Sequence, residues 1–349
     1  MNRKKTISIL VLITLFISFF TNIIFIGPIH LAEALDITTY TDTNTTLNIT
    51  VYNNEPQINW YDLQNSTGSS KLNVNERLDI NEEYIFIINV TSDQGWADIE
   101  YINITSWFDN GNDASTYNQT AGGNINMYLQ YDNSTEVASY NMLWPDDEVT
   151  KGAMTETVID ANTHNISLRF TPSYQVRYAP GDGAWNTSAG HNDLWTWNFN
   201  ISIADDDGYN NSATSEYGVY MYSQITQTTE SPSGTGTPGQ NDITLNPHTN
   251  VTTRCNANYS LSTNLPNLTD GLGNYIQNSS ISAQGGSLGR TNFPGNGPLY
   301  IYGGAASYRN HLVNTFEDTV EVIYWANITM GTIAGDYSST VTYILNGES

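Results

Sequence analysis

The segment Trp195-Thr196-Trp197-Asn198-Phe199-Asn200-Ile201-Ser202-Ile203 alternates large apolar residues with small polar ones. Successive side chains of a β-strand point to opposite faces of a sheet, so this period of two predicts a strand with one buried and one solvated face. Trp195 and Trp197 both fall on the apolar face, and we expect both in the core. The segments Tyr84–Thr91 and Val320–Ile328 repeat the alternation.

Further strands are expected along the rest of the chain, separated by turn sequences such as Asp109-Asn110-Gly111. Thr, Asn, Ser, Ile, Val and Tyr dominate the composition, which favours strands and turns over helices. Many short strands with such turns predict an all-β protein, a sandwich or a barrel. These strands are expected near residues 46–52, 57–63, 98–107, 125–131, 137–143, 165–170, 217–226, 243–252, 257–262, 275–282 and 336–345.

The N-terminal residues have the pattern of a secretory signal. The basic Arg3-Lys4-Lys5 precedes an apolar run, Ile7–Ile26, and Ala32-Glu33-Ala34 has the A-x-A spacing that signal peptidase cuts. Residues 1–34 are therefore expected to be a signal peptide, although the run is also long enough for an uncleaved anchor. In both cases we expect the rest of the chain outside the cytoplasmic membrane.

A change in composition divides the remaining chain. Residues 227–241 contain no large apolar side chain and are rich in Ser, Thr, Pro and Gly, which predicts a linker. Residues 35–226 before it are expected to form one large sandwich or two smaller ones. Residues 242–349 after it have the length of one immunoglobulin-like sandwich.

The charge balance excludes several classes of partner. The chain has 11 Lys and Arg against 35 Asp and Glu, a net charge of −24. Nucleic acids and anionic membrane surfaces both require clustered basic residues, so we expect neither, and expect membrane contact only through the N-terminal segment. Cys255 is the only cysteine, which rules out an intramolecular disulfide and a multi-cysteine zinc site. We expect it buried in a strand, or else joined to another chain.

Acceptor triplets for N-glycosylation, N-x-[ST], are unusually frequent. Random placement would give about nine, and the chain has sixteen. Several read N-I-T or N-I-S, and alternation then turns the isoleucine inward and the acceptor asparagine outward, where a glycan must lie. The predicted acceptors are Asn44, Asn48, Asn65, Asn89, Asn103, Asn118, Asn133, Asn165, Asn186, Asn200, Asn210, Asn250, Asn258, Asn267, Asn278 and Asn327.

Two stretches carry a family resemblance. Asn53-Asn54-Glu55-Pro56 after a strand, followed by Asp93-x-Gly95-Trp96-x-Asp98-Ile99, resembles the Ig-like repeats of secreted archaeal and bacterial surface proteins. The segment Ala334–Tyr343 is similar to the closing hairpin of such modules. The resemblance implies tandem Ig-like β-sandwich domains at the cell surface, and it implies no catalytic residue.

Acidic residues at strand ends are the candidate metal ligands. Asp93 and the run Asp205, Asp206 and Asp207 would repel one another, and Ca²⁺ would relieve this through oxygen ligands. The spacing differs from the EF-hand loop, so solvated acidic turns are the alternative. Asp109–Asp113 is a second, partial oxygen-rich loop. We expect no cofactor other than calcium.

The sequence contains no motif that predicts a catalytic site. Gly285–Gly289 matches G-x-S-x-G, but Arg290-Thr291-Asn292-Phe293-Pro294 after it cannot begin the helix that a nucleophile elbow requires. No H-E-x-x-H pair is present, and the histidines outside the signal are expected to be incidental loop residues: His164, His191, His248 and His311.

Together these observations predict a non-catalytic, extracellular glycoprotein of the cell envelope with a structural or adhesive role. Its expected partners are other cell-surface proteins or glycans, with self-association through strand edges. The first alternative is a binding module for carbohydrate or a surface protein, with or without calcium. It calls for exposed aromatic side chains, and Trp325 is one whose exposure the sequence leaves open. The second alternative is a glycan-acting enzyme, which needs two carboxylates about 5 to 10 Å apart in a cleft.

Overall fold

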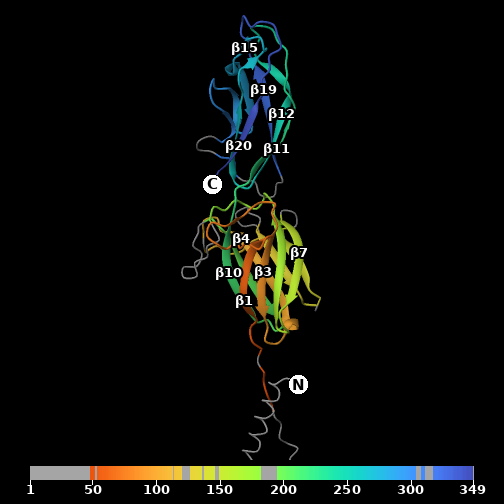
Figure 1. Ribbon diagram of the computed structural model, residues 1–349. Coiled ribbons are helices and arrows are strands. Elements are labelled where there is room, and N and C mark those ends of the chain that lie inside the picture. Colours follow the sequence, from red (N-terminus) through yellow and green to blue (C-terminus); the bar gives the residue numbers. More distant parts are fainter. Residues whose placement is uncertain are drawn as a thin grey trace, which may run out of the picture. The chain divides into compact units, whose positions relative to one another are not determined.

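The computed structural model in Figure 1 describes residues 48–348, apart from residues 52, 113, 120–125, 136, 146–148, 182–194, 304–307 and 311–316. This described chain is all-β, as predicted: its strands pair antiparallel except β2, which pairs parallel with β10, and it has two short 3₁₀ helices and no α-helix. The expected signal peptide or anchor, residues 1–34, lies outside the described residues.

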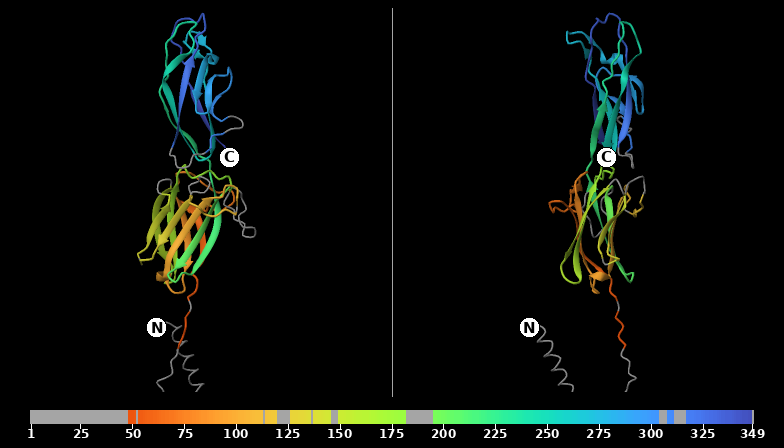
Figure 2. Two further views of the ribbon diagram at one scale, coloured as in Figure 1. Left: turned by 180° about the vertical axis from the view of Figure 1, so that it is seen from behind. Right: turned by 90° about the vertical axis from the view of Figure 1, so that its right-hand side faces the viewer.

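Two sheets formed by residues 57–219 face each other, and we call them the N-terminal sheet pair. The right-hand view of Figure 2 shows them as two layers. The four-stranded sheet has the order β1 (Gln57–Asn65), β3 (Tyr84–Thr91), β8 (Thr163–Pro172) and β7 (Val149–Val158). The six-stranded sheet has the order β2 (Arg77–Leu78), β10 (Asn210–Val219), β9 (Trp197–Asp205), β4 (Ile99–Phe108), β5 (Met127–Asp132) and β6 (Ser139–Trp144).

The core of the N-terminal sheet pair follows the alternation read from the sequence. Every second residue of β9 from Trp197 to Ile203 is buried. Phe86 of the opposite sheet meets Phe199 edge-on, with ring centroids 5.1 Å apart. Trp195, however, precedes the strand with a φ of 68° and is 43% exposed, so its expected place in the core is wrong. The alternation ends where the extended backbone ends.

Residues 223–348 form a second arrangement of facing sheets, the C-terminal sheet pair, with its own core around Val251, Leu261 and Val322. The five-stranded sheet has the order β11 (Ser223–Thr229), β12 (Ile243–Cys255), β19 (Asp318–Ala326), β16 (Ile281–Gly285) and β17 (Leu288–Asn292). The three-stranded sheet has the order β18 (Leu299–Tyr302), β13 (Asn258–Asn264) and β20 (Thr342–Glu348). The short β14 (Leu268–Thr269) and β15 (Tyr275–Ile276) form a separate ladder.

The passage between the two sheet pairs is the short segment Tyr220–Tyr222, upstream of the residues predicted to be a linker. It is held by the buried Asn256, whose Nδ2 donates to the Tyr220 carbonyl (2.9 Å) and whose Oδ1 accepts from the Tyr222 amide (2.7 Å). The predicted linker, residues 227–241, begins inside β11. Within it, Ser233 forms an isolated antiparallel β-bridge with Asn246 of β12. A strand at a sheet edge needs few apolar residues, so composition alone does not reveal it.

Two other expectations about strands differ from the structure. Residues 48–51 are exposed and form no strand, although 46–52 was expected to be one. β7 was not foreseen, because its sequence alternates weakly and most of its side chains face solvent. Both sheet pairs belong to one compact unit, Tyr52–Ser349.

Candidate functional site

The end of β9 carries the acidic residues that the sequence singled out, and we call Asp205–Asp207 the acidic turn. Asp205 is buried: its Oδ1 accepts from the Tyr209 amide (2.8 Å) and its Oδ2 from Asn53 Nδ2 (3.1 Å). The same Nδ2 lies 3.2 Å from Asp207 Oδ2. Amide donors from the segment before β1 therefore stabilise this turn.

The structure also brings Asp93 to this end of the sheet pair. Its Oδ2 accepts from Nδ2 of Asn54, 3.0 Å away, which is the residue next to Asn53. Three of the four carboxylates predicted from sequence, those of Asp93, Asp205 and Asp207, are thus linked through two adjacent asparagines. No three acidic, histidine or cysteine side chains in the described ranges are arranged to hold a metal ion, so calcium at the acidic turn stays a prediction.

Sequence reasoning missed a further carboxylate here, Asp98 in the 3₁₀ helix η1 (Trp96–Asp98). Its Oδ2 accepts from the Ser92 hydroxyl (2.6 Å), and its carbonyl accepts from the Asp206 amide (3.0 Å). Burial raises the pKa of Asp98, and the nearby charges of Asp205 and Asp206 raise it further. Carboxylates at this end therefore do repel one another, as the sequence suggested.

The opposite end of β9 holds a group of buried polar side chains, which we call the buried polar cluster: Asp109, Thr196, Asn198 and Glu216. The Thr196 hydroxyl lies 3.1 Å from both Asp109 Oδ2 and Glu216 Oε2. A hydroxyl has one proton to donate, so the two carboxylates share it. Asp109 is 2% exposed and Glu216 is 0% exposed.

Asn198 is the fourth member of this cluster, and it lies in β9, between β10 and β4. It lies opposite Glu216 of β10 and opposite Trp107 of β4, so all three side chains lie on the outer face of the six-stranded sheet. Asn198 is 0% exposed, and neither its Oδ1 nor its Nδ2 has a hydrogen-bond partner. Buried amides are nearly always satisfied, so this one points to a missing ligand or water.

The loop after β4 packs this cluster against Trp195. Asp109 Oδ1 accepts from the Gly111 amide (2.9 Å). Gly111 has a φ of 75°, and a Cβ there would lie 2.9 Å from the Trp195 ring. The turn thus requires glycine both for its backbone conformation and for space. The Trp195 ring remains partly exposed beside the buried carboxylates.

His164 was expected to be an incidental loop residue, and this expectation is wrong. It lies in β8 and is buried, with Nδ1 2.6 Å from Glu156 Oε1 and its ring stacked on Trp96 at 4.0 Å. The Tyr131 hydroxyl donates to Glu156 Oε2 (2.9 Å), and burial raises the pKa of Tyr131. His248 also lies in a strand rather than a loop, β12, and its Nδ1 is 2.9 Å from Glu321 Oε1. His191 and His311 lie outside the described residues.

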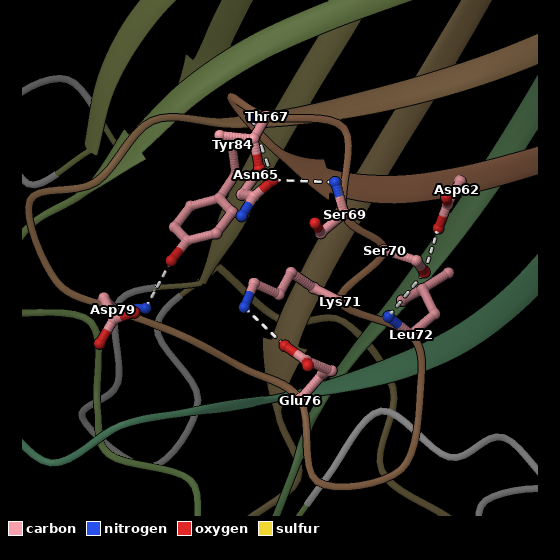
Figure 3. A network of polar contacts seen from close by, with 10 residues as sticks. All are labelled: Asp62, Asn65, Thr67, Ser69, Ser70, Lys71, Leu72, Glu76, Asp79 and Tyr84. Atoms are coloured by element: carbon pink, nitrogen blue, oxygen red, sulfur yellow. Dashed lines mark hydrogen bonds and ion pairs between the residues drawn. The ribbon is translucent and has the colours of Figure 1, made fainter.

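The predicted glycan acceptors divide by burial. Exposed side chains belong to Asn48, Asn118, Asn210, Asn250 and Asn267, and half-buried ones to Asn65, Asn103, Asn165, Asn200, Asn258, Asn278 and Asn327. Figure 3 shows how a half-buried acceptor is used: Asn65 Oδ1 accepts from the Thr67 and Ser69 amides and so builds its own turn. Asn44 and Asn186 lie outside the described residues.

Asn89 and Asn133 are buried, although both were predicted to be glycan acceptors. Asn89 lies in a ladder across the four-stranded sheet: it accepts from Asn59 Nδ2 (2.6 Å) and donates its own Nδ2 to Asn165 Oδ1 (2.6 Å). Asn133 Nδ2 donates to the Ile99 carbonyl (3.0 Å). In the folded chain both attachment nitrogens are occupied.

Three remaining expectations can be placed. Trp325 is half-buried on the outer face of β19, with the Arg290 guanidinium 4.5 Å from its ring. Cys255 is buried in β12, and burial raises the pKa of its thiol to about 11, as for an unreactive strand cysteine. Ser287 lies in the hairpin between β16 and β17, so the G-x-S-x-G match is followed by a strand.

Comparison with known proteins gave no relative. No protein-family model matches the chain, and no curated protein is significantly similar to it. The described part of the chain contains no helix with the length and hydropathy of a membrane span.

Proposed function

We propose that this chain is a non-catalytic, N-glycosylated protein of the cell envelope, displayed outside the cell, with a structural or adhesive role. Its two sheet pairs would be tandem Ig-like β-sandwich domains, delivered by the N-terminal signal or held by it as an anchor. Its partners would be other cell-surface proteins or glycans.

The distribution of exposed acceptor asparagines supports this proposal most directly. Asn118 and Asn210 belong to the N-terminal sheet pair, and Asn250 and Asn267 to the C-terminal one. Glycans at these positions would hydrate a surface that has few basic residues, with 11 Lys and Arg in the chain. Acceptors on both sheet pairs favour a coated, solvent-facing molecule over one whose surface serves a single pocket.

A structural role is also favoured by the accessible sheet edges. β7, Val149–Val158, is an edge of its sheet, and within the described residues it pairs with β8 alone. Such an edge can accept another strand by backbone hydrogen bonding, and charged residues such as Lys151 limit this to a matched partner. Self-association through edges would suit an envelope or filament component.

The burial of the carboxylates argues for a non-catalytic role. Thr196 brings Asp109 and Glu216 together, but both lie under other residues, whereas a glycosidase pair must reach its substrate. The glycan-acting enzyme therefore ranks below the structural role.

Peptide mapping by mass spectrometry of the native protein, from separate envelope and medium fractions, tests the proposal. We expect an N-terminus at Leu35 or Met1, glycan mass on exposed acceptors such as Asn210 and Asn250, and enrichment in the envelope. Asn89 and Asn133 serve as internal controls and should be bare. Bare exposed acceptors in a protein free in the medium would remove the support for the proposal.

A binding module for carbohydrate or a surface protein is the second candidate, and one observation favours it. Several aromatic rings that could stack on sugars are exposed: Trp60, Trp195 and Tyr275. We expect a glycan array to detect binding that Trp195→Ala abolishes and Trp60→Ala, on the edge strand β1, leaves intact. No binding by the wild-type protein on such an array speaks against this candidate.

A further inference from the structure

We propose that the buried polar cluster of Asp109, Thr196, Asn198 and Glu216 is a calcium site, separate from the acidic turn. The proposal does not depend on the structural role above. It rests on the close approach of two buried carboxylates and on a buried amide that has no partner.

The first observation is that two buried carboxylates approach the same hydroxyl group. Asp109 follows β4 and Glu216 lies in β10, and each is 3.1 Å from the same Thr196 hydroxyl. Carboxylate oxygens that converge on one point are the ligands that calcium prefers in proteins. A divalent cation at this point would accept an oxygen from each carboxylate.

Asn198 supplies the second and independent observation. Its side chain is fully buried, lies directly across the ladder from Glu216, and has both amide atoms unpartnered. An unsatisfied buried amide costs about 1 to 3 kcal/mol. Its Oδ1 is the kind of neutral oxygen that completes a calcium shell beside two carboxylates.

The donor set selects the metal. All four side chains offer oxygen, from two carboxylates, one amide and one hydroxyl. Calcium accepts irregular sets of six to eight oxygens, whereas zinc and copper favour histidine and cysteine. Magnesium demands near-ideal octahedral geometry at short metal–oxygen distances, a stricter requirement than that of calcium. Waters or backbone carbonyls would supply the remaining ligands.

An ordered water alone is the competing explanation, because one water could satisfy the Asn198 amide. The two explanations differ in their response to calcium. A water leaves the protein indifferent to chelators, whereas a calcium site makes stability depend on the free calcium concentration.

The test uses the whole mature protein, stripped with EGTA and dialysed. Isothermal titration with CaCl₂ should show saturable binding with a Kd on the order of 10⁻⁴ to 10⁻³ M, the range of extracellular calcium modules. Glu216→Gln should weaken this binding by about tenfold or more, since it removes one ligand charge. Asp207→Asn, on the acidic turn, is the matched control and should leave that binding unchanged.

Terbium luminescence tests the location without a ligand substitution. Trp107 lies beside Asn198 in the ladder, so it should sensitise Tb³⁺ bound at the cluster. Trp107→Phe should lower the emission while leaving the calcium stoichiometry unchanged, and it keeps the test decisive if Glu216→Gln does not fold. Absence of calcium binding up to about 10 mM would overturn the proposal. So would binding that Asp207→Asn abolishes and Glu216→Gln leaves intact.

Discussion

The two ends of β9 present acidic residues in opposite ways. At its C-terminal end, the acidic turn gathers consecutive aspartates that face solvent or accept from Asn53 and the Tyr209 amide. At its N-terminal end, Asp109 from the loop after β4 and Glu216 from β10 are buried around Thr196. The first group is visible as consecutive residues in the sequence. The second group comes together only because β9 pairs with β10 and β4 in the folded sheet.

This difference shows that a run of consecutive acidic residues in the sequence does not by itself identify a binding site. Consecutive aspartates at a turn can use nearby backbone amides, and water takes the rest of their charge. The buried carboxylates of Asp109 and Glu216 instead take donors from other segments of the fold, among them the Thr196 hydroxyl and the Gly111 amide. Substitutions at the two ends should therefore change the free energy of unfolding by different amounts.

Trp197→Ala is expected to have the largest effect, a loss of about 3 to 5 kcal/mol in the free energy of unfolding. Trp197 is fully buried at the first position of β9 and stacks on Tyr217. Urea denaturation followed by circular dichroism measures this loss. The matched control is Trp195→Ala two residues earlier, expected to cost less than half as much because that ring is partly exposed. Equal costs would contradict the assigned start of the strand.

Asn198→Leu should change the free energy of unfolding with a sign that depends on calcium. In EGTA, removal of an unsatisfied buried amide should stabilise the protein by about 1 to 3 kcal/mol. With millimolar calcium this advantage should shrink or reverse, because the wild-type protein gains a ligand. Thermal denaturation in both buffers gives the comparison, with Asn200→Leu, next along the same face, as the control. A gain that calcium does not alter would support a bound water.

Asn53→Ala should cost about 0.5 to 1.5 kcal/mol, since it removes the amide that donates to Asp205 and approaches Asp207. Denaturant titration at neutral pH measures it. Asn54→Ala, which removes one exposed contact to Asp93, should cost less. If both variants match the wild type, the segment before β1 does not stabilise the acidic turn.

Asp98→Asn should have the smallest effect, and it depends on pH. The folded chain raises the pKa of Asp98, so the folded state holds its proton more tightly than the unfolded state. Wild-type stability therefore falls as the pH rises from the unfolded pKa through the raised folded pKa. The variant should lack this fall and be more stable at pH 7 by less than about 1 kcal/mol, because the carboxyl is largely solvated.

Denaturation at several pH values between about 3 and 7 follows this effect, with Asp93→Asn as the exposed control. An Asp98→Asn curve parallel to that of the wild type would show that the carboxyl does not couple to the acidic turn.

The fold class could be predicted because alternation is a local signal. Trp197–Ile203 reads as a strand from its own residues, and the structure agrees. Trp195 shows the limit, since the alternation continues past the point where the backbone leaves the extended region. The strand β11 shows another limit, because an edge strand rich in threonine has the composition of a linker.

The site was predictable only where its residues are neighbours in the chain. The acidic turn was visible, and Asp109 stood out in its own loop. Glu216 and Asn198 gave no signal, because their proximity depends on the register of β9 against β10. His164 likewise gave none, since its partner Glu156 lies on the adjacent strand and its stacking partner, Trp96, on another element. Register is a tertiary property that one sequence does not reveal.

The asparagine ladder across the four-stranded sheet has a consequence for the order of events during biosynthesis. Asn89 is an open acceptor in the nascent chain and a closed one once its amide donates to Asn165. A transferase that acts before β3 pairs with β8 would attach a sugar to the nitrogen that donates to Asn165, and the sugar would have to displace that contact in the folded sheet. The glycan occupancy of Asn89 in folded molecules therefore reports the order of folding and glycosylation. A bare Asn89 in a molecule with an occupied Asn210 indicates that the sheet folded before the transferase acted.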